Sequence, residues 1–271
     1  MDYAIIGGDA RFLYLASLLK RQGYNVGLFF RKADGIGDVS YIKEDKLFLA
    51  KNIIVNYPPQ TDSGITYEEI LSKVSDKAKI YLCGPKNPNA CPLHRKVVNL
   101  WEDEMLLLEN AYLTAEGAVA AAMQASSHIM KDLNCMIIGW GRIGRALAEI
   151  LVGLGARAVV VSRSEVNRNR AVERGAESIA MEEAELRLPE QRVIFSTPPS
   201  MVLDERLLQF VNEDALIIDL ASPPYGVDLR TAWNRGIRAW REPGLPGRYC
   251  PESAAEALLK ALERAGGMEN V

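Results

Sequence analysis

A glycine-rich turn between an apolar segment and a helical segment constrains this chain more than any other feature. Met136 to Ile138 form an apolar run, and Gly139, Gly141 and Gly144 follow with the spacing G-x-G-x-x-G. In this pattern the first glycine permits a tight turn, the second lets backbone approach a pyrophosphate, and the third lets helix and strand pack closely. We therefore predict a buried strand, a turn and a helix from Arg145 to Leu154.

The surroundings of this turn favour a dinucleotide as its ligand. A second apolar run, Ala158 to Val161, completes a strand–helix–strand unit. The free N–H groups at the start of the helix and the positive end of its dipole would then face the phosphates. The alternative is a tight strand–helix turn without a ligand. The turn residues predicted to bind the dinucleotide are Gly139, Gly141, Arg142, Ile143 and Gly144.

The residues after the second strand indicate which dinucleotide binds. Sites for NAD place Asp or Glu here to hold the ribose 2′-OH. This chain has Ser162, Arg163 and Ser164 instead, and Glu165 comes later. Arg163 can pair with a 2′-phosphate and the two hydroxyls can donate to it, so we predict NADP(H) over NAD(H). The alternative is that Arg163 is a solvated loop arginine.

Two later strand ends are predicted to lie at the nicotinamide end of the same site. Arg192 to Phe195 and Leu216 to Leu220 are apolar runs, and each is followed by a proline-containing segment. Carboxyl ends of parallel strands are where open α/β sheets bind ligands. The residues expected to contact the cofactor there are Thr197, Pro198, Ala221 and Ser222.

Length and composition fit a two-domain globular protein. A chain of 271 residues suggests two domains, and 48% hydrophobic with 25% charged residues is ordinary. A net charge of -3 gives no sign of a nucleic-acid surface. We expect neither a membrane span nor a signal peptide, because no long apolar run and no basic leader segment are present.

The cysteine and histidine content indicates a protein of a reducing compartment, and a metal site is not expected. None of the four cysteines forms a C-x-x-C pair, and the chain has only two histidines. We expect a cytoplasmic protein. The cysteines are Cys83, Cys91, Cys135 and Cys250.

The N-terminal segment predicts a second α/β domain. Apolar runs at Tyr3 to Ile6 and Asn25 to Phe30 flank a helical pattern from Phe12 to Arg21. We therefore predict an α/β fold with two open doubly wound domains, the second a Rossmann dinucleotide-binding domain. The expected division is a substrate and catalytic domain at 1–113 and an NADP-binding domain at 114–271, with a linking helix at 114–131 and a C-terminal helix at 252–266.

The turn of this first unit carries a candidate substrate contact. Gly7 and Gly8 are not followed by a third glycine, so a second nucleotide is not expected. Asp9 is expected to cap the helix. Arg11 lies in the first helical turn at the end of a parallel strand. It either clamps a substrate carboxylate or is a surface arginine.

Other candidates lie on loops and helix starts. Thr61 and Ser63 belong to a polar loop that either lines a pocket or merely connects elements. Glu116, with Thr114 as helix N-cap, is an acid/base candidate or complements the helix dipole. Residues 243–251 are expected to form a rigid loop, because they contain three prolines and two glycines. The further substrate candidates are Gly247, Arg248 and, at the start of the last helix, Ser253.

Five segments in order give the chain a specific resemblance. They are Gly7 to Arg11 (GGDAR), Thr114 to Ala118, Gly139 to Gly144, Ile218 to Ser222 and Pro243 to Gly247 (PGLPG). Together they resemble the larger, or A, subunits of dipicolinate synthases from spore-forming bacteria. The chain departs from the pattern in the loop Asn56 to Gly64 and at Arg248 to Pro251.

The resemblance implies an activity and a partner. It implies an NADP-linked oxidation of dihydrodipicolinate, formed from a lysine-pathway intermediate, to pyridine-2,6-dicarboxylate. It also implies a homo- or hetero-oligomer, a flavoprotein-like B subunit as partner, and a place in the mother-cell cytoplasm during sporulation. A substrate with two carboxylates needs cations or backbone donors, which Arg11, Arg248 and the helix start at Ser253 offer.

Two other functions fit the same residues. One is a different NADP-dependent dehydrogenase of a small carboxylate, such as a 2-hydroxyacid or shikimate-type enzyme. Neither histidine lies on an obvious strand-end loop, which counts against the hydroxyacid type. The other is a nucleotide-sensing regulatory protein without chemistry of its own.

Overall fold

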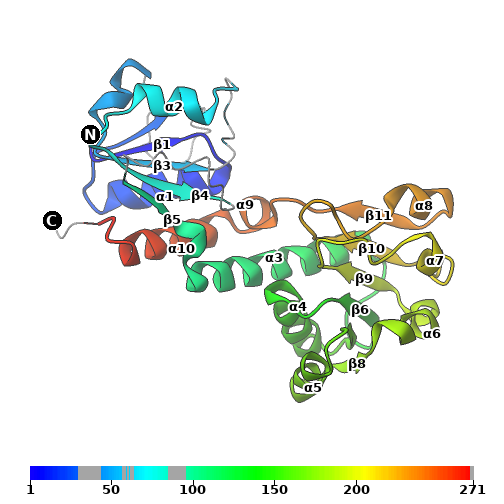
Figure 1. Cartoon of the computed structure of the whole chain (residues 1–271). Coiled ribbons are helices and arrows are strands. Elements are labelled where there is room, and N and C mark those ends of the chain that lie inside the picture. The colour runs from blue at the N-terminus through cyan, green and yellow to red at the C-terminus, as the bar shows by residue number, and fades with distance from the viewer. Residues whose placement is uncertain (30–43, 57–58, 60, 62–63, 85–95, 269–271) are drawn as a thin grey trace. The chain divides into compact units, whose positions relative to one another are not determined.

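The computed structural model of the chain contains two α/β units, each built on one parallel sheet (Figure 1). The structure describes residues 1–29, 44–56, 59, 61, 64–84 and 96–268. The first unit comprises Met1–Asn110 and Pro246–Val271, and the second comprises Ala111–Leu245. The prediction of two open α/β domains is confirmed.

The first unit is built on a five-stranded parallel sheet with the order β2-β1-β3-β4-β5. The order reverses between β1 and β3, as in doubly wound folds, and ligands bind at such a switch point. Most residues of these strands are apolar and buried, whereas those of the edge strand β5 are half-buried. Their bounds are β1 Tyr3–Ile6, β2 Val26–Phe29, β3 Asn52–Asn56, β4 Lys79–Cys83 and β5 Val97–Asn99.

Two helices of the first unit, α1 and α2, begin at side-chain caps. The Asp9 carboxylate accepts from the Arg11 N–H at the start of α1, as predicted. Thr66 and Glu69 form a capping box before α2. The helices are α1 Ala10–Arg21, α2 Tyr67–Lys73, α9 Leu245–Tyr249 and α10 Pro251–Arg264, with 3-10 turns at Glu44–Leu49 and Leu100–Glu102.

The C-terminal helix α10 belongs to the first unit, not to the second. Leu258 and Leu262 of α10 are buried in one core with Leu15 and Leu19 of α1. This corrects the sequence-based division at 113/114, which assigned the helix to the NADP-binding domain. The physical reason is that the apolar face of α10 is buried against α1, far away in sequence.

The second unit is built on a six-stranded parallel sheet with the order β11-β10-β9-β6-β7-β8. Counted from β6, this is the Rossmann order 3-2-1-4-5-6 read from the other edge, so the predicted Rossmann domain is confirmed. The switch point lies between β6 and β9. The strands are β6 Asn134–Ile138, β7 Arg157–Val161, β8 Glu177–Ile179, β9 Val193–Ser196, β10 Leu216–Asp219 and β11 Arg238–Arg241.

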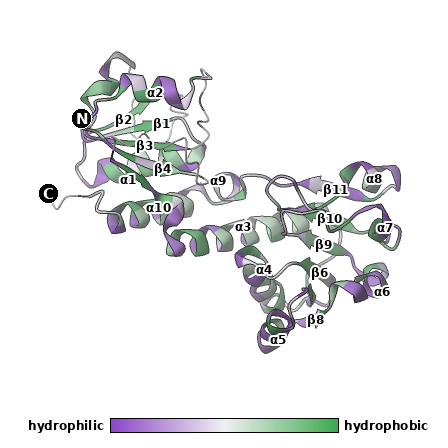
Figure 2. Cartoon of the chain, in the orientation of Figure 1, coloured by the Kyte–Doolittle hydropathy of each residue, from purple (hydrophilic) through white to green (hydrophobic). Residues whose placement is uncertain are grey.

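Helices flank this sheet and complete its core. The hydropathy colouring shows apolar strands within each sheet and mixed helices outside them (Figure 2). Met136 and Ile138 of β6 share one buried cluster with Ile194 and Ile217 of the neighbouring strands. The helices are α4 Arg142–Gly153, α5 Glu165–Glu173, α6 Ala184–Arg187, α7 Glu205–Leu208 and α8 Leu229–Asn234, with 3-10 turns at Met181–Glu183 and Leu188–Glu190.

Helix α3 is one continuous helix, Glu104–Ala125, in which the chain passes from the first unit to the second. The sequence predicted a separate linking helix at 114–131, with Thr114 as its N-cap. That boundary is wrong at both ends: no proline interrupts residues 104–125, Gly117 is accommodated inside the helix, and the helix ends at Ala125. Thr114 is therefore an interior residue, not an N-cap.

The expected rigid loop at 243–251 contains one turn of helix, α9. Proline is compatible with the first turn of a helix, so Pro246 does not prevent it. The loop prediction is wrong for Leu245–Tyr249. The predicted start of the last helix near Pro251 is confirmed.

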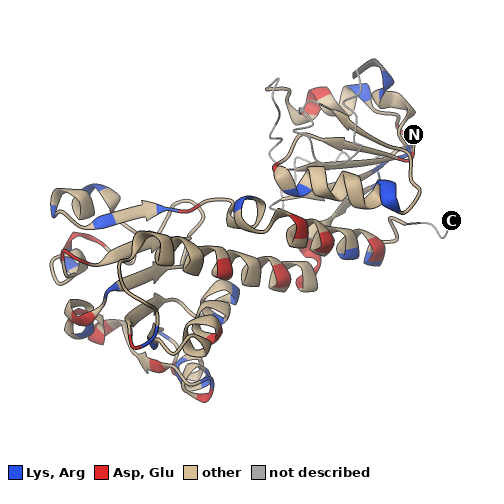
Figure 3. Ribbon diagram, turned by 180° about the vertical axis from the view of Figure 1, so that it is seen from behind, with Lys and Arg blue, Asp and Glu red and all other residues tan. Residues whose placement is uncertain are grey.

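Among the described residues, charged positions lie mainly on helices and loops, and the inner strands carry few (Figure 3). The edge strand β11 begins and ends with arginine, at Arg238 and Arg241. Within the described parts of the chain, no helix combines the length and apolar composition needed to cross a bilayer.

Candidate functional site: a turn and pocket of the second unit

The turn after β6 requires glycine at two positions. Gly139 has a φ of +100°, and a Cβ there would lie 2.5 Å from Thr197 Oγ1. A Cβ at Gly144 would overlap the carbonyl oxygen of Gly139. The glycines therefore allow the strand, the turn and helix α4 to pack more closely than any other residue permits.

The start of α4 presents backbone donors. Gly141 is the N-cap residue and supplies no side-chain hydrogen bond. Arg142, Ile143 and Gly144 form the first turn, where N–H groups have no acceptor within the helix. A Cβ at Gly141 would meet no atom within 4 Å, so the space in front of the turn is open. These donors and the helix dipole suit a phosphate.

A pocket of about 610 Å³ lies at the carboxyl ends of β6, β7 and β9. Its size is within the range of small-molecule sites. Apolar side chains supply part of the wall, including Val161, Met181, Met201, Val202 and Leu207. Of the predicted cofactor residues, the structure brings seven together around it: Gly139, Gly141, Ser162, Arg163, Ser164, Thr197 and Pro198.

The segment after β7 is held by its own side chains. Ser164 caps α5 by accepting from the Asn167 N–H at 3.4 Å. Arg168, which sequence reasoning missed, donates through Nη1 to the carbonyl oxygens of Ser162 at 2.8 Å and Arg163 at 3.2 Å. Nothing in the sequence marks Arg168, because its role depends on the path of the turn.

Two arginines line the pocket, and only one of them has an ion-pair partner among the described residues. Arg206 donates to Glu185 at 2.9 Å. Arg163 is exposed, and its side chain has no hydrogen bond or ion pair among the described residues. Arg163 is thus the pocket cation that can meet an anionic ligand without giving up a partner in the described parts of the chain.

Five predicted cofactor residues do not line the pocket, and one that does line it, Thr197, has a partner already. Arg142, Ile143 and Gly144 lie in the first turn of α4. Thr197 already donates its hydroxyl hydrogen to the Ile138 carbonyl oxygen at 2.9 Å, so its hydroxyl can only accept from a ligand. Ala221 and Ser222 follow β10 and do not line this pocket.

A buried carboxylate organises the segment after β10. Asp219, whose side chain is fully buried, accepts from the backbone N–H groups of Ala221 and Gly226, both at 3.2 Å. Burial raises the pKa of the Asp219 carboxyl, while these N–H groups and the nearby Arg241 guanidinium act in the opposite direction. Sequence reasoning missed Asp219, although a carboxylate inside the apolar run Leu216 to Leu220 was a visible signal.

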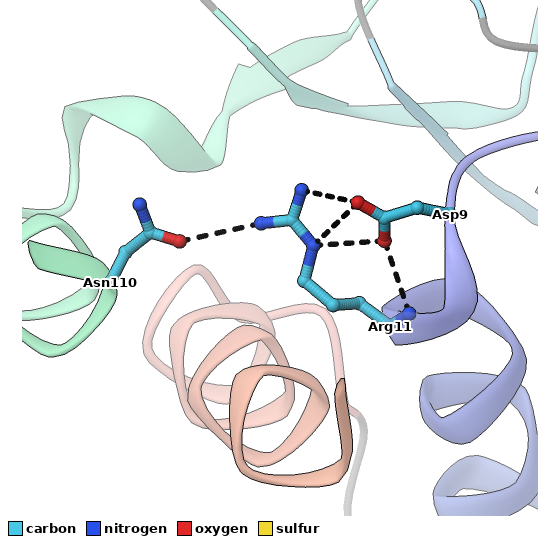
Figure 4. A network of polar contacts seen from close by, with 3 residues as sticks. All are labelled: Asp9, Arg11 and Asn110. Carbon is cyan, nitrogen blue, oxygen red and sulfur yellow. Dashed lines mark hydrogen bonds and ion pairs between the residues drawn. The ribbon is translucent and has the colours of Figure 1, made fainter. Parts of the chain in front are cut away.

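In the first unit, Arg11 is paired with a side chain of its own turn (Figure 4). Its Nε lies 2.9 Å from Asp9 Oδ1 and its Nη2 lies 2.7 Å from Asp9 Oδ2. Nη1 donates to Asn110 Oδ1 at 3.3 Å. The Arg11 side chain is only 12% exposed, so the surface-arginine alternative is wrong. A ligand carboxylate would have to approach the edge formed by Nη1 and Nη2.

The two most specific segments of the resemblance meet in this unit. A Cβ at Gly247 would overlap the Asp9 carboxylate, so the last glycine of PGLPG lies against the aspartate of GGDAR. Glycine is required at Gly247 for that contact. This brings together residues from opposite ends of the chain.

The remaining predicted residues are more scattered. Thr61 is half-buried, and its hydroxyl has no partner among the described residues; Ser63 lies outside them. Arg248 is exposed and Ser253 lies in the first turn of α10. Glu116 is exposed in the middle of α3, so the helix-start premise for its role is wrong.

Comparisons with known proteins agree with this architecture. Residues 134–223 match the family model described as NADP oxidoreductase, coenzyme F420-dependent. The chain is 28% identical to the A subunit of dipicolinate synthase from Bacillus subtilis, over 97% of this chain and 95% of that protein. The resemblance inferred from the five segments is confirmed.

Solved structures give the same result. The crystal structure of the dipicolinate synthase A subunit from Bacillus halodurans has a TM-score of 0.82 and 27% identity, and the match covers 97% of each chain. A transhydrogenase structure from Sinorhizobium meliloti has a TM-score of 0.71 at 15% identity, covering 97% of this chain and 94% of that one. This second likeness concerns the fold alone.

Proposed function

We propose that this chain is the larger, or A, component of a dipicolinate synthase and oxidises dihydrodipicolinate to pyridine-2,6-dicarboxylate with NADP⁺. The observation that carries the proposal is the pocket at the switch point of the second sheet, where the glycine turn, Ser162, Arg163 and Ser164 lie together. The similarity to a dipicolinate synthase along 97% of the chain supports the choice of substrate.

The cofactor choice rests on the end of β7. The turn of Gly139, Gly141 and Gly144 fits a pyrophosphate, because glycine leaves room there for a close approach of backbone. Arg163 is exposed on the pocket wall, where it would pair with the 2′-phosphate of NADP. Arg168 acts as a positioning residue, since it holds the carbonyl groups of the two residues that carry this site.

The bound nicotinamide would accept a hydride from a ring carbon of the substrate. The residues of this chain would then need to orient the substrate and receive one proton, since formation of the aromatic ring favours the step. Arg11 would bind a carboxylate through the edge that Asp9 leaves open. Thr61, Ser63, Gly247, Arg248 and Ser253 are further proposed substrate contacts, and Glu116 is the proposed proton acceptor.

The proposed setting follows from the resemblance. In a dipicolinate synthase the chain would assemble with a flavoprotein-like B subunit into an oligomer and act in the mother-cell cytoplasm during sporulation. The similarity to a protein that is one lettered component of its enzyme supports the existence of a second component.

Cofactor titration tests the proposal directly. The purified chain is expected to bind NADP⁺ more tightly than NAD⁺, and Arg163→Ala is expected to weaken NADP⁺ binding about 10- to 100-fold with little effect on NAD⁺. Tighter binding of NAD⁺ would contradict the cofactor choice.

An activity assay separates this proposal from the two alternatives. NADP⁺ reduction with the lysine-pathway intermediate, measured in the presence and in the absence of the B subunit, is expected for a dipicolinate synthase. A different carboxylate dehydrogenase would reduce NADP⁺ only with another substrate. A regulatory protein would bind the nucleotide and reduce nothing. A normal rate for Glu116→Gln would remove the proton-transfer role of Glu116.

A further inference from the structure

We infer that Arg241, at the carboxyl end of β11 in the second unit, binds a carboxylate of the substrate. This inference rests on the proposed function and adds a contact that sequence reasoning did not identify. Arg241 is the last residue of β11, and its side chain is 39% exposed. Its guanidinium carbon lies 3.8 Å from the centre of the Tyr225 ring.

The sheet register places Arg241 at the ligand edge. Arg241 pairs with Asp219 of β10, and Asp219 pairs with Ser196 of β9. All three residues end parallel strands, so they lie in one row along the carboxyl edge. With about 4.8 Å between strands, Arg241 lies roughly 10 Å from the end of β9. A substrate bound beside the carboxyl ends of β9 and β10 would be within reach of this arginine.

The surroundings of Arg241 fix its orientation without using up its donors. Arg241 Nε lies 3.8 Å from Asp219 Oδ2, whereas Arg11 lies 2.7 Å from Asp9 in the first unit. The Asp219 oxygens already accept from two backbone N–H groups. Among the described residues, the terminal nitrogens of Arg241 have no hydrogen-bond partner. The forked edge of the guanidinium can therefore bind a planar carboxylate in a bidentate manner.

Tyr225 is held in an unusual backbone conformation beneath this arginine. Its φ is +72°, in the left-handed region that side chains other than glycine rarely adopt. The next residue, Gly226, is fixed because a Cβ there would overlap Ser196 Oγ. Such conformations persist where the surrounding structure imposes them, often at ligand sites. We assign Tyr225 as a positioning residue, whose ring fixes the plane of the Arg241 guanidinium.

The dissociation constant of pyridine-2,6-dicarboxylate tests the inference. It is measured by calorimetry on the intact chain at saturating NADP⁺. Arg241→Ala is expected to weaken the dicarboxylate about 10- to 100-fold, as loss of a charge-assisted hydrogen-bonded contact predicts. Arg241→Lys should recover part of this affinity, because lysine keeps the charge without the planar fork. NADP⁺ affinity should stay unchanged in both variants, which also shows that they fold.

Matched variants separate the contact from a general effect of charge. Arg230→Ala removes an exposed arginine from α8 of the same unit and should leave dicarboxylate binding unchanged. Tyr225→Phe should bind like the wild type, whereas Tyr225→Gly, which tolerates the same φ, should bind about 3-fold more weakly.

Two outcomes would overturn the inference. If Arg241→Ala and Arg241→Lys bind the dicarboxylate as the wild type does, the contact is absent while the proposed function stands. If the wild type binds NADP⁺ but not the dicarboxylate, the carboxylate role of Arg241 is wrong. Failure of the wild type to bind either nicotinamide nucleotide would instead contradict the proposed function itself.

Discussion

The helices that follow the first strand of each sheet, α1 and α4, begin in opposite ways. In the first unit, the strand β1 leads through two glycines to Asp9, whose carboxylate caps α1 and pairs with Arg11. In the second unit, β6 leads to Gly141, which gives α4 no side-chain cap. Both turns follow the first strand of a parallel sheet. In the turn before α1, which we call the closed turn, the Asp9 carboxylate accepts from the helix start. In the turn before α4, the open turn, no side chain of the described residues does so, and the backbone donors can bind an anionic ligand.

This difference explains why two similar turns need not have the same function. A helix start already neutralised by Asp9 offers little to a phosphate, since the carboxylate and a phosphate would repel each other. The open turn at Gly141 keeps its N–H groups and the dipole available. The absence of a third glycine in the first turn and the presence of a carboxylate there point to the same conclusion.

The largest effect is expected at Gly144, on which the open turn depends. In Gly144→Ala the added Cβ would overlap the Gly139 carbonyl oxygen, so the turn and α4 must move apart. We expect NADP⁺ affinity to fall more than about 100-fold and stability to fall by about 1–3 kcal/mol. Calorimetric titration with NADP⁺ and thermal denaturation of the intact chain measure the two effects.

Gly153→Ala provides the control in the same helix. A Cβ at Gly153 meets no atom within 4 Å, so this variant should bind NADP⁺ normally and be slightly more stable. Wild-type affinity in Gly144→Ala would mean that close packing at this turn is not needed for the cofactor.

A smaller effect on NADP⁺ affinity is expected when a carboxylate is introduced at the open turn, as Asp9 provides at the closed turn. Gly141→Asp places an acid at the N-cap of α4, where φ is −77° and the space is open. We expect NADP⁺ binding to weaken about 10- to 30-fold through repulsion of the pyrophosphate, while the melting temperature stays equal or rises.

Gly141→Asn separates charge from size in this test. The asparagine side chain is neutral and has nearly the same shape as aspartate. Gly141→Asn should therefore weaken NADP⁺ binding less than Gly141→Asp does. Equal losses in both variants would show that steric exclusion, not charge, weakens binding.

The two turns also show how far the sequence predicts this molecule. The spacing of Gly139, Gly141 and Gly144 predicts strand, turn and helix because each glycine has a local steric reason. Asp9 is also predicted locally, because an aspartate before a helix can accept from an N–H group of the first turn. The Asp9–Arg11 pair could be anticipated only in part, since Asn110 and Gly247 come to that site from distant segments.

Features that depend on tertiary packing could not be read from local patterns. The assignment of α10 to the first unit depends on which apolar faces meet, and the start of α3 depends on the absence of a break before its alanine-rich part. In the sequence, nothing distinguishes Arg241 from other charged residues at the end of a strand. Its proposed role emerges only when the register aligns it with Asp219 and the loop brings Tyr225 beneath it.

A moderate effect is expected from removal of the arginine at the closed turn. In Arg11→Ala the proposed carboxylate contact is lost, so we expect the substrate KM to rise about 10-fold with an unchanged NADP⁺ KM. Arg21→Ala, at the exposed end of the same helix, is the matched control and should have neither effect. An unchanged substrate KM in Arg11→Ala would mean that the arginine serves only to hold Asp9.

The smallest effect is expected at a second acid-capped helix start, that of α3. Asp103 accepts from the Leu106 N–H at 3.1 Å and from Arg264 Nε at 2.6 Å. The Arg264 guanidinium lowers the pKa of the Asp103 carboxyl in the folded state. The pair therefore stabilises the fold at pH values above the unfolded-state pKa, and this stability is lost as the pH falls through the folded-state pKa.

Because Arg264 is 41% exposed, we expect Arg264→Gln to lower the free energy of unfolding by only about 0.5–1 kcal/mol at pH 7. Urea denaturation should show this difference shrinking as the pH falls below the ordinary aspartate pKa of about 3.9, whereas Arg21→Gln should show no difference at neutral or acid pH. A difference that persists in acid would mean that Arg264 stabilises α10 by packing and not through the charge at the helix start.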